Sequence, residues 1–148
     1  MPDRPIDILV VEDDPDHVEL ALHALAEFSA TTRIHVARDG AEALDFLFAR
    51  GAYAVRDVVR DAPRVVLLDL KLPRVDGLDV LRQVKSDPRT KAIPVVMLTS
   101  SRLEQDVLES YELGVNSYIV KPMSYDQFMK SMKEIGLYWL MLNVPVNS

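Results

Sequence analysis

The sequence predicts an α/β fold, a doubly wound parallel sheet of five strands with helices on both faces. Five short apolar runs alternate with five helical patterns along the chain, and parallel strands need long, usually helical crossovers between them. The runs "ILVV" and "VVLL" are apolar at every position, which is typical of strands buried on both faces. We take 2-1-3-4-5 as the hypothetical strand order.

The first part of the chain supplies two strands and two helices. Residues 8–11 form a strand, and Asp14 as N-cap with Pro15 at the first helical position opens a helix to about residue 28. Residues 33–37 form the second strand, and a helix begins from Asp39.

The segment "GAYAVRDVVRDA", residues 51–62, is long for a connection in such a fold and apolar for a linker. We expect it to extend the second helix or to form a surface flap.

The remaining strands cover residues 65–70, 93–99 and 117–120, with a helix over 77–85. Ser101 and Glu104 form a capping box that opens the fourth helix, and Gly114 should end it. Ser124 with Gln127 caps the last helix.

Length and composition indicate one globular domain of ordinary size over residues 1–148, with 49% hydrophobic and 27% charged residues. No apolar run approaches the ~20 residues that span a bilayer, the N-terminus "MPDRPID" lacks a signal-peptide core, and cysteine is absent. We therefore expect a cytoplasmic protein without a membrane partner. The net charge of -6 argues against direct binding of nucleic acid, because phosphate binding needs clustered Lys and Arg.

Polar residues stand at the carboxyl ends of four strands: Glu12 and Asp13, Asp69, Thr99, and Lys121. In the order 2-1-3-4-5 they converge on one edge of the sheet. Neighbouring carboxylates repel one another unless a cation offsets their charge. An all-oxygen ligand set favours Mg²⁺ as the cofactor.

Such a set suits phosphoryl transfer, in which catalysis is mostly positioning and charge neutralisation. Asp69 would be the nucleophile and form an acyl phosphate. Lys121 and Thr99 would each contact a phosphoryl oxygen. Taken singly, these residues are more often turn, cap or strand residues, so the prediction depends on their combination.

Four segments in this order and spacing, "ILVVEDDPDH", "VVLLDLKLPRVDG", "PVVMLTSS" and "GVNSYIVKP", resemble a response-regulator receiver domain of flavodoxin-like fold. The resemblance covers about residues 7–142. It implies a two-component phosphorelay in which Asp69 accepts a phosphoryl group from a sensor histidine kinase. Asp69 would gain and lose this group without turnover of an external substrate, so the resemblance does not imply an enzyme.

The resemblance also implies a ligand set and a switch. Glu12 and Asp13 would form the acidic pair, and Mg²⁺ would bind this pair, Asp69 and the backbone carbonyl of Lys71. On phosphorylation Thr99 would move toward the phosphoryl group, and the ring of Tyr118 would fill the vacated space. The Lys121–Pro122 peptide bond would be cis.

The last helix and tail, residues 124–148, indicate how a signal could leave the domain. No DNA-binding helices follow, so we expect output through another protein. The stretch "IGLYWLML" is apolar almost all round, and such a helix is expected to be buried on every side. We predict a homodimer interface; the alternative is that this segment folds back on its own domain. The predicted interface residues are Ile135, Leu137, Tyr138, Trp139, Met141 and Leu142.

The 51–62 insertion and the ending "YWLMLNVP" further resemble single-domain regulators paired with bacterial and cyanobacterial phytochrome kinases. The main alternative is a receiver-like interaction module that works without phosphorylation. A phosphatase with an aspartyl-phosphate intermediate is disfavoured, because Lys71 stands where its general acid would be. A flavodoxin-like cofactor binder is disfavoured, because "EDDPDH" would repel phosphate. His17, His23 and His35 lack ligand spacing and are interpreted as surface or ordinary core residues.

Overall fold

The computed structural model describes residues 6–26, 32–121 and 124–142. Strands and helices alternate along these residues. The elements are β1 (Ile8–Val11), α1 (Pro15–Ala24), β2 (Ile34–Ala37), α2 (Gly40–Leu47), a short 3-10 helix η2 (Gly51–Tyr53), β3 (Val65–Leu68), α3 (Gly77–Ser86), β4 (Val95–Thr99), α4 (Glu104–Glu112), β5 (Ser117–Val120), α5 (Tyr125–Gly136) and a π-helical turn η3 (Leu137–Leu142). Among the described residues, no helix is both long and apolar enough to cross a membrane.

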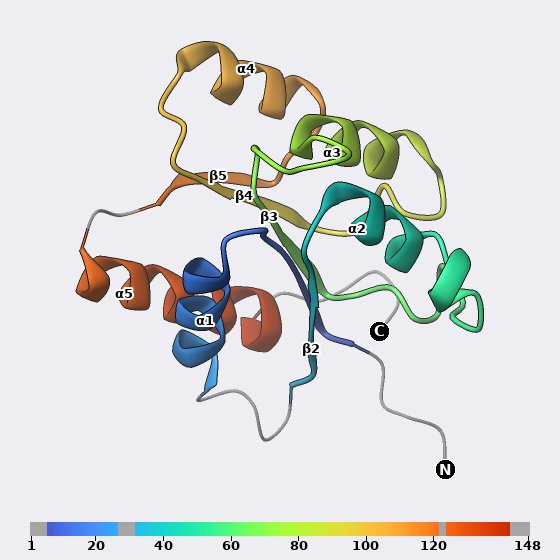
Figure 1. The fold of residues 1–148 in the computed structure, drawn as a ribbon, viewed down its shortest axis with the longest axis horizontal. Coiled ribbons are helices and arrows are strands. Elements are labelled where there is room, and N and C mark those ends of the chain that lie inside the picture. Colours follow the sequence, from blue (N-terminus) through green and yellow to red (C-terminus); the bar gives the residue numbers. More distant parts are fainter. Residues whose placement is uncertain (1–5, 27–31, 122–123, 143–148) are drawn as a thin grey trace.

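The strands form one parallel sheet in the order β2-β1-β3-β4-β5. This confirms the predicted fold class and strand order. Helices α1 and α5 lie together on one side of the sheet, while α2, α3 and α4 lie on the other (Figure 1). Because all strands run in the same direction, the carboxyl ends of β1, β3, β4 and β5 meet at one edge.

Successive residues of the central strands face opposite cores. Leu9 and Val11 of β1 pack with side chains of α2 and α3, whereas Ile8 and Val10 pack with α1 and α5. All four side chains are buried. Burial on both faces explains why β1 and β3 contain no polar residue, and why the first polar side chains come where the strands end.

Helix boundaries follow the predicted signals at several positions. Asp14, Asp39 and Ser124 each accept a hydrogen bond from a backbone N–H in the first turn of α1, α2 and α5. Gly114, with φ of 100°, follows the end of α4, as expected for a residue in the left-handed region. Helix α1 ends at Ala24, earlier than predicted; residue 28 lies outside the described residues.

The predicted capping box is wrong. Helix α4 begins at Glu104 with Leu103 as its N-cap, so Ser101 is too far upstream to cap it. The Ser101 hydroxyl instead donates to Asp106 Oδ2 at 2.6 Å and accepts from the Leu103 N–H at 3.3 Å. The β4–α4 loop is therefore ordered by a side-chain bond that reaches over the helix start.

Residues 51–62 form a surface flap and do not extend α2, which ends at Leu47. Arg56 attaches the flap to the domain. Its guanidinium lies 3.5 Å from the centre of the Phe46 ring, and it donates to the carbonyl oxygens of Phe46 and Asp61. Of the two alternatives that the sequence left open, the structure takes the flap.

Candidate functional site

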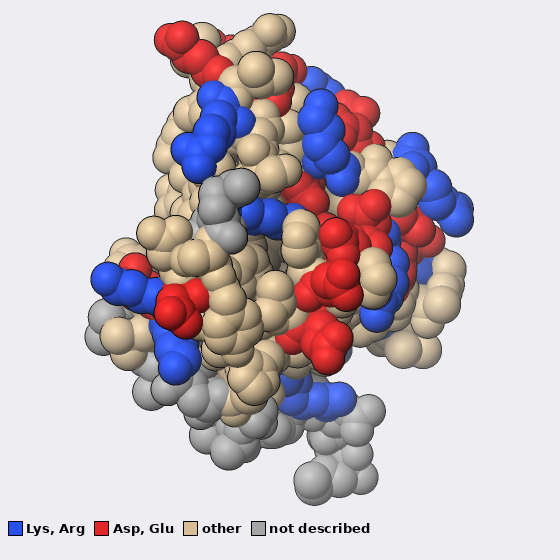
Figure 2. All heavy atoms as spheres, turned by 60° about the vertical axis from the view of Figure 1, so that its left-hand side comes forward, with Lys and Arg blue, Asp and Glu red and all other residues tan. Residues whose placement is uncertain are grey.

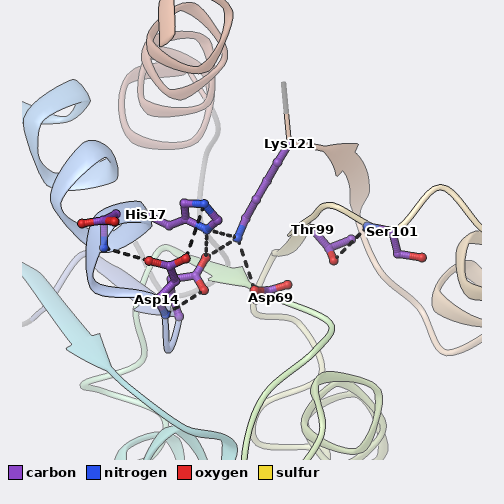
Figure 3. Close-up of polar contacts among 8 residues, drawn as sticks. Asp14, His17, Asp69, Thr99, Ser101 and Lys121 are labelled. Carbon is purple, nitrogen blue, oxygen red and sulfur yellow. Dashed lines mark hydrogen bonds and ion pairs between the residues drawn. The ribbon is translucent and has the colours of Figure 1, made fainter. Parts of the chain in front are cut away.

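Lys121 lies at the centre of the polar residues on the carboxyl edge of the sheet (Figure 3). It follows β5, and its side chain extends toward the ends of β1 and β3. Its Nζ donates to Glu12 Oε1 and, at 3.2 Å, to Asp69 Oδ2. Glu12 is 6% exposed, and Asp69 and Lys121 are each 8% exposed. One buried ammonium is thus shared by two buried carboxylates.

The charges of this site are not balanced by its own residues. Burial raises the pKa of Glu12, and the neighbouring Asp69 carboxylate acts in the same direction, while the hydrogen bond from Lys121 opposes both. Asp13 adds a third carboxylate at the exposed rim. A second cation would therefore be stabilised here.

Glu12, Asp13 and Asp69 each offer one carboxylate oxygen, and these oxygens all lie within 4.8 Å of one another. An all-oxygen donor set with one open, exposed member fits a hard divalent ion that keeps several waters. Acidic side chains gather near the middle of the face in Figure 2, with basic side chains around them. The Lys71 side chain is exposed, and its carbonyl stays a predicted ligand.

The backbone is held by hydrogen bonds at Asp69 and at the next residue, Leu70. Its N–H donates to the Val11 carbonyl at 3.1 Å, and the Gly77 N–H donates to the Leu70 carbonyl at 2.9 Å. A Cβ added at Gly77 would lie 2.2 Å from the carbonyl oxygen of Asp69 and 2.7 Å from that of Leu70. Only glycine allows α3 to begin this close to the predicted phosphoacceptor.

The two predicted switch residues contact the same residue of the β4–α4 loop. Thr99 is fully buried, and its Oγ1 accepts a hydrogen bond from the Ser101 N–H at 3.3 Å. The Tyr118 hydroxyl donates to the Ser101 carbonyl at 3.1 Å, and partial burial raises the pKa of Tyr118. Movement of this loop would therefore be felt by both side chains. Figure 3 shows Thr99 and Ser101 on the side of Asp69 away from His17.

His17 belongs to this site, although the sequence interpretation placed it among surface or core histidines. Its Nδ1 lies 2.8 Å from Lys121 Nζ and 3.5 Å from Glu12 Oε1, and its Nε2 lies 3.7 Å from Asp14 Oδ2. Helical side chains lean toward the helix N-terminus. A histidine in the first turn after a strand end could have been recognised by that rule.

The predicted interface residues divide between core and surface. Ile135 is 5% exposed and packs in the core between α1, α5 and the sheet, and Trp139 packs against that core. Ile135 continues the apolar stripe of α5, so it is a core residue of its own domain and is not free to contact a partner. Leu137 and Tyr138 are each 50% exposed. The side chains of Met141 and Leu142, and the predicted cis Lys121–Pro122 bond, lie outside the described residues.

Comparison with known proteins identifies relatives over nearly the whole chain. The family described as the response regulator receiver domain matches residues 8–133. The structure of the bacteriophytochrome response regulator AtBRR is 50% identical with a TM-score of 0.72, covering 96% of this chain and 100% of that one.

Two further solved structures are similar. The phosphorylated cyanobacterial phytochrome response regulator RcpA is 38% identical with a TM-score of 0.89, covering 97% of this chain and 99% of that one. The Mn²⁺-bound form of Rcp1 is 37% identical with a TM-score of 0.87, covering 95% and 99%. Rcp1 is a response regulator from Synechocystis sp..

Proposed function

The chain belongs to the response-regulator receiver family, and we propose that it accepts a phosphoryl group on Asp69 from a sensor histidine kinase. The observation that carries this proposal is the contact of Lys121 with Glu12 and Asp69, buried together at the carboxyl edge of the sheet. A receiver-like interaction module would have no need to hold an ammonium against this carboxylate.

The proposed step transfers the phosphoryl group from a phosphohistidine of the kinase. A carboxylate oxygen of Asp69 attacks phosphorus, an O–P bond forms and the P–N bond breaks. The kinase imidazole leaves with the electron pair and takes up a proton. Lys121 Nζ, 3.2 Å from Asp69 Oδ2, is close enough to turn toward the added phosphoryl oxygens, and the buried Thr99 hydroxyl can donate to another.

Mg²⁺ would be held by Asp69, Glu12 and Asp13, with the Lys71 carbonyl as a further ligand. Bound there, it would supply neutralisation of the charge shared by the carboxylate and the phosphoryl group. The Mn²⁺-bound structure of the relative Rcp1 supports a divalent ion in such a receiver. Hydrolysis of the acyl phosphate by water would restore Asp69, so the protein is not an enzyme with an external substrate.

The signal would leave through Ser101 and its two neighbours. If Thr99 moves to donate to a phosphoryl oxygen, its Oγ1 would draw away from the Ser101 N–H, from which it now accepts a hydrogen bond. The Tyr118 hydroxyl is bound to the Ser101 carbonyl, so its ring would lose this contact and turn inward. Phosphorylation shifts the equilibrium only by its different interaction with the two states.

The test is intact mass spectrometry after incubation with Mg²⁺ and a small phosphodonor. We expect one metal-dependent phosphoryl adduct, absent from Asp69→Asn. Asp76→Asn, in the exposed loop before α3 where the side chain makes no capping bond, is the matched control and should react like the wild type. If the folded wild-type protein binds Mg²⁺ but gives no adduct, the interaction module is the better explanation.

The partner would be a phytochrome-type histidine kinase. Two of the similar structures are response regulators of this kind: one is a cyanobacterial phytochrome response regulator, and the other is a bacteriophytochrome response regulator. We expect faster phosphotransfer from a purified bacteriophytochrome kinase than from a kinase with an unrelated sensor at equal concentration. Equal rates from both would contradict the pairing. We propose the cytoplasm as the location of this protein.

A homodimer would use the exposed start of η3. Leu137 and Tyr138 are apolar or aromatic side chains left half exposed, and the Tyr138 ring packs edge-on against Trp139 with centroids 4.8 Å apart. We expect the molar mass in solution to rise with concentration and Leu137→Glu to abolish that rise. Leu22→Glu, a change at another exposed leucine, should leave it intact. A monomer at all concentrations, with and without phosphorylation, would exclude the dimer.

A further inference from the structure

We propose that His17 is a positioning residue, which holds the Lys121 ammonium beside Asp69 when a bound metal draws Glu12 away. The inference rests on the proposed function above. His17 lies in the first turn of α1, and its ring points to the Lys121 ammonium (Figure 3). The distance from its Nδ1 to Lys121 Nζ is 2.8 Å, shorter than the 3.2 Å from that Nζ to Asp69 Oδ2.

The two partners fix which atom donates. A lysine ammonium has three hydrogens and no lone pair, so it must donate and His17 Nδ1 must accept. The neutral ring then carries its hydrogen on Nε2, which faces Asp14 Oδ2 at 3.7 Å. His17 is therefore an acceptor for Lys121 and not a second cation beside it.

The three acceptors of Lys121 come from three separate elements. Glu12 follows β1, His17 lies in α1, and Asp69 follows β3. With two N–H groups directed at Glu12 and His17, the third is directed at Asp69, where the phosphoryl group would be added. An ammonium with a single anchor could swing away, so its orientation depends on keeping two.

Glu12 is the less permanent of these anchors. Its carboxylate also belongs to the oxygen cluster with Asp13 and Asp69, and a divalent ion attracts a carboxylate more strongly than an ammonium does. His17 presents nitrogen, which Mg²⁺ disfavours as a ligand, and its Nδ1 already faces Lys121. His17 therefore remains as the anchor when the metal site fills.

The experiment compares His17→Leu with His17→Asn. Leucine removes the acceptor at similar size, whereas the Oδ1 of asparagine occupies the place of Nδ1 on the side chain. His17 is 38% exposed, so neither change should disturb the core. The readout is the initial rate of Asp69 phosphorylation by a small phosphodonor at saturating Mg²⁺, with saturation of each variant checked by calorimetry.

We expect His17→Leu to be phosphorylated about tenfold more slowly, at the lower end of the range for one hydrogen bond to a charged donor, and His17→Asn to stay within about twofold of the wild type. A wild-type rate in His17→Leu, or equal slowing in both variants, would overturn the proposal. Failure of the wild type itself to react would instead count against the proposed function.

A second readout does not depend on phosphorylation. In ¹⁵N spectra of the wild-type protein, His17 Nδ1 should have the signature of an unprotonated nitrogen that accepts a hydrogen bond, with and without Mg²⁺. Lys121→Met supplies the reference for a free Nδ1. If the wild-type signal moves to that reference when Mg²⁺ is added, His17 does not hold Lys121 in the metal-bound state and the proposal is wrong.

Discussion

Replacing Gly77 by alanine should damage the proposed phosphorylation site as well as the fold. The added Cβ would lie 2.2 Å from the Asp69 carbonyl oxygen, 2.7 Å from that of Leu70 and 2.8 Å from Leu70 Cα. Real Cβ contacts do not fall below 3.0 Å, so going from 2.2 to 3.0 Å requires a shift of about 0.8 Å. The obstructing atoms are backbone atoms, so no side-chain rotation can relieve the clash, and Asp69 itself must move or α3 must retreat.

The magnitude follows from these contacts. Overpacking of this kind costs ~1–3 kcal/mol, and strain on the bond from the Gly77 N–H to the Leu70 carbonyl adds up to about 1 kcal/mol. We expect the free energy of unfolding to fall by about 3 kcal/mol. Misplacement of a reacting group on the order of 1 Å can lower a rate ~100-fold, so phosphorylation of the folded variant should fall by one to two orders of magnitude.

Urea unfolding followed by Trp139 fluorescence measures the first effect, and intact mass spectrometry with Mg²⁺ and a phosphodonor measures the second. The control is Gly51→Ala in the flap. Its φ of +57° would be strained by a side chain, but the nearest atom, Asp45 Oδ2, is 3.4 Å from the added Cβ. This control should lose about 1 kcal/mol and react normally. Phosphorylation of Gly77→Ala at the wild-type rate would refute the reasoning.

Three smaller changes test other contacts. Tyr118→Phe removes the bond to the Ser101 carbonyl and should lower the unfolding free energy by about 1 kcal/mol in urea; an unchanged midpoint would argue against that bond. Burial lowers the pKa of Lys85 to about 8, so the unfolded chain binds more protons between about pH 8 and 10.5 and stability should rise with pH there. Lys85→Met should lack this rise in thermal melts, and parallel curves would contradict it. Arg56→Lys loses the planar contact with Phe46 and should cost about 1 kcal/mol and speed protease cleavage of the flap; an unchanged cleavage rate would speak against that anchoring.

Strands and helices could be predicted where the local sequence signals and the burial of the side chains indicate the same structure. The runs of β1 and β3 are buried on both faces, and Asp14 caps the helix that Pro15 opens. The capping box predicted at Ser101 was wrong, because the sequence pattern of a capping box does not show whether another acceptor competes for the serine hydroxyl. Asp106, five residues on, takes the Ser101 hydroxyl. The sequence also left the path of the flap undecided, since that path depends on the contact between Arg56 and Phe46 of α2.

The site also contains residues that the sequence could predict and a residue that it could not. Glu12 and Asp69 were predictable because a parallel sheet brings the ends of its strands to one edge, whatever their side chains do afterwards. His17 does not end a strand. Its position in the first turn of α1 brings it near the edge, but its contact with the site depends on the side chain of Lys121, 104 residues later in the chain, which extends to α1. Sequence and topology thus determine which groups reach the edge. The acceptors that share the Lys121 ammonium depend on the direction of the Lys121 side chain. That direction depends in turn on where the acceptors lie in the folded protein, which the sequence pattern does not give.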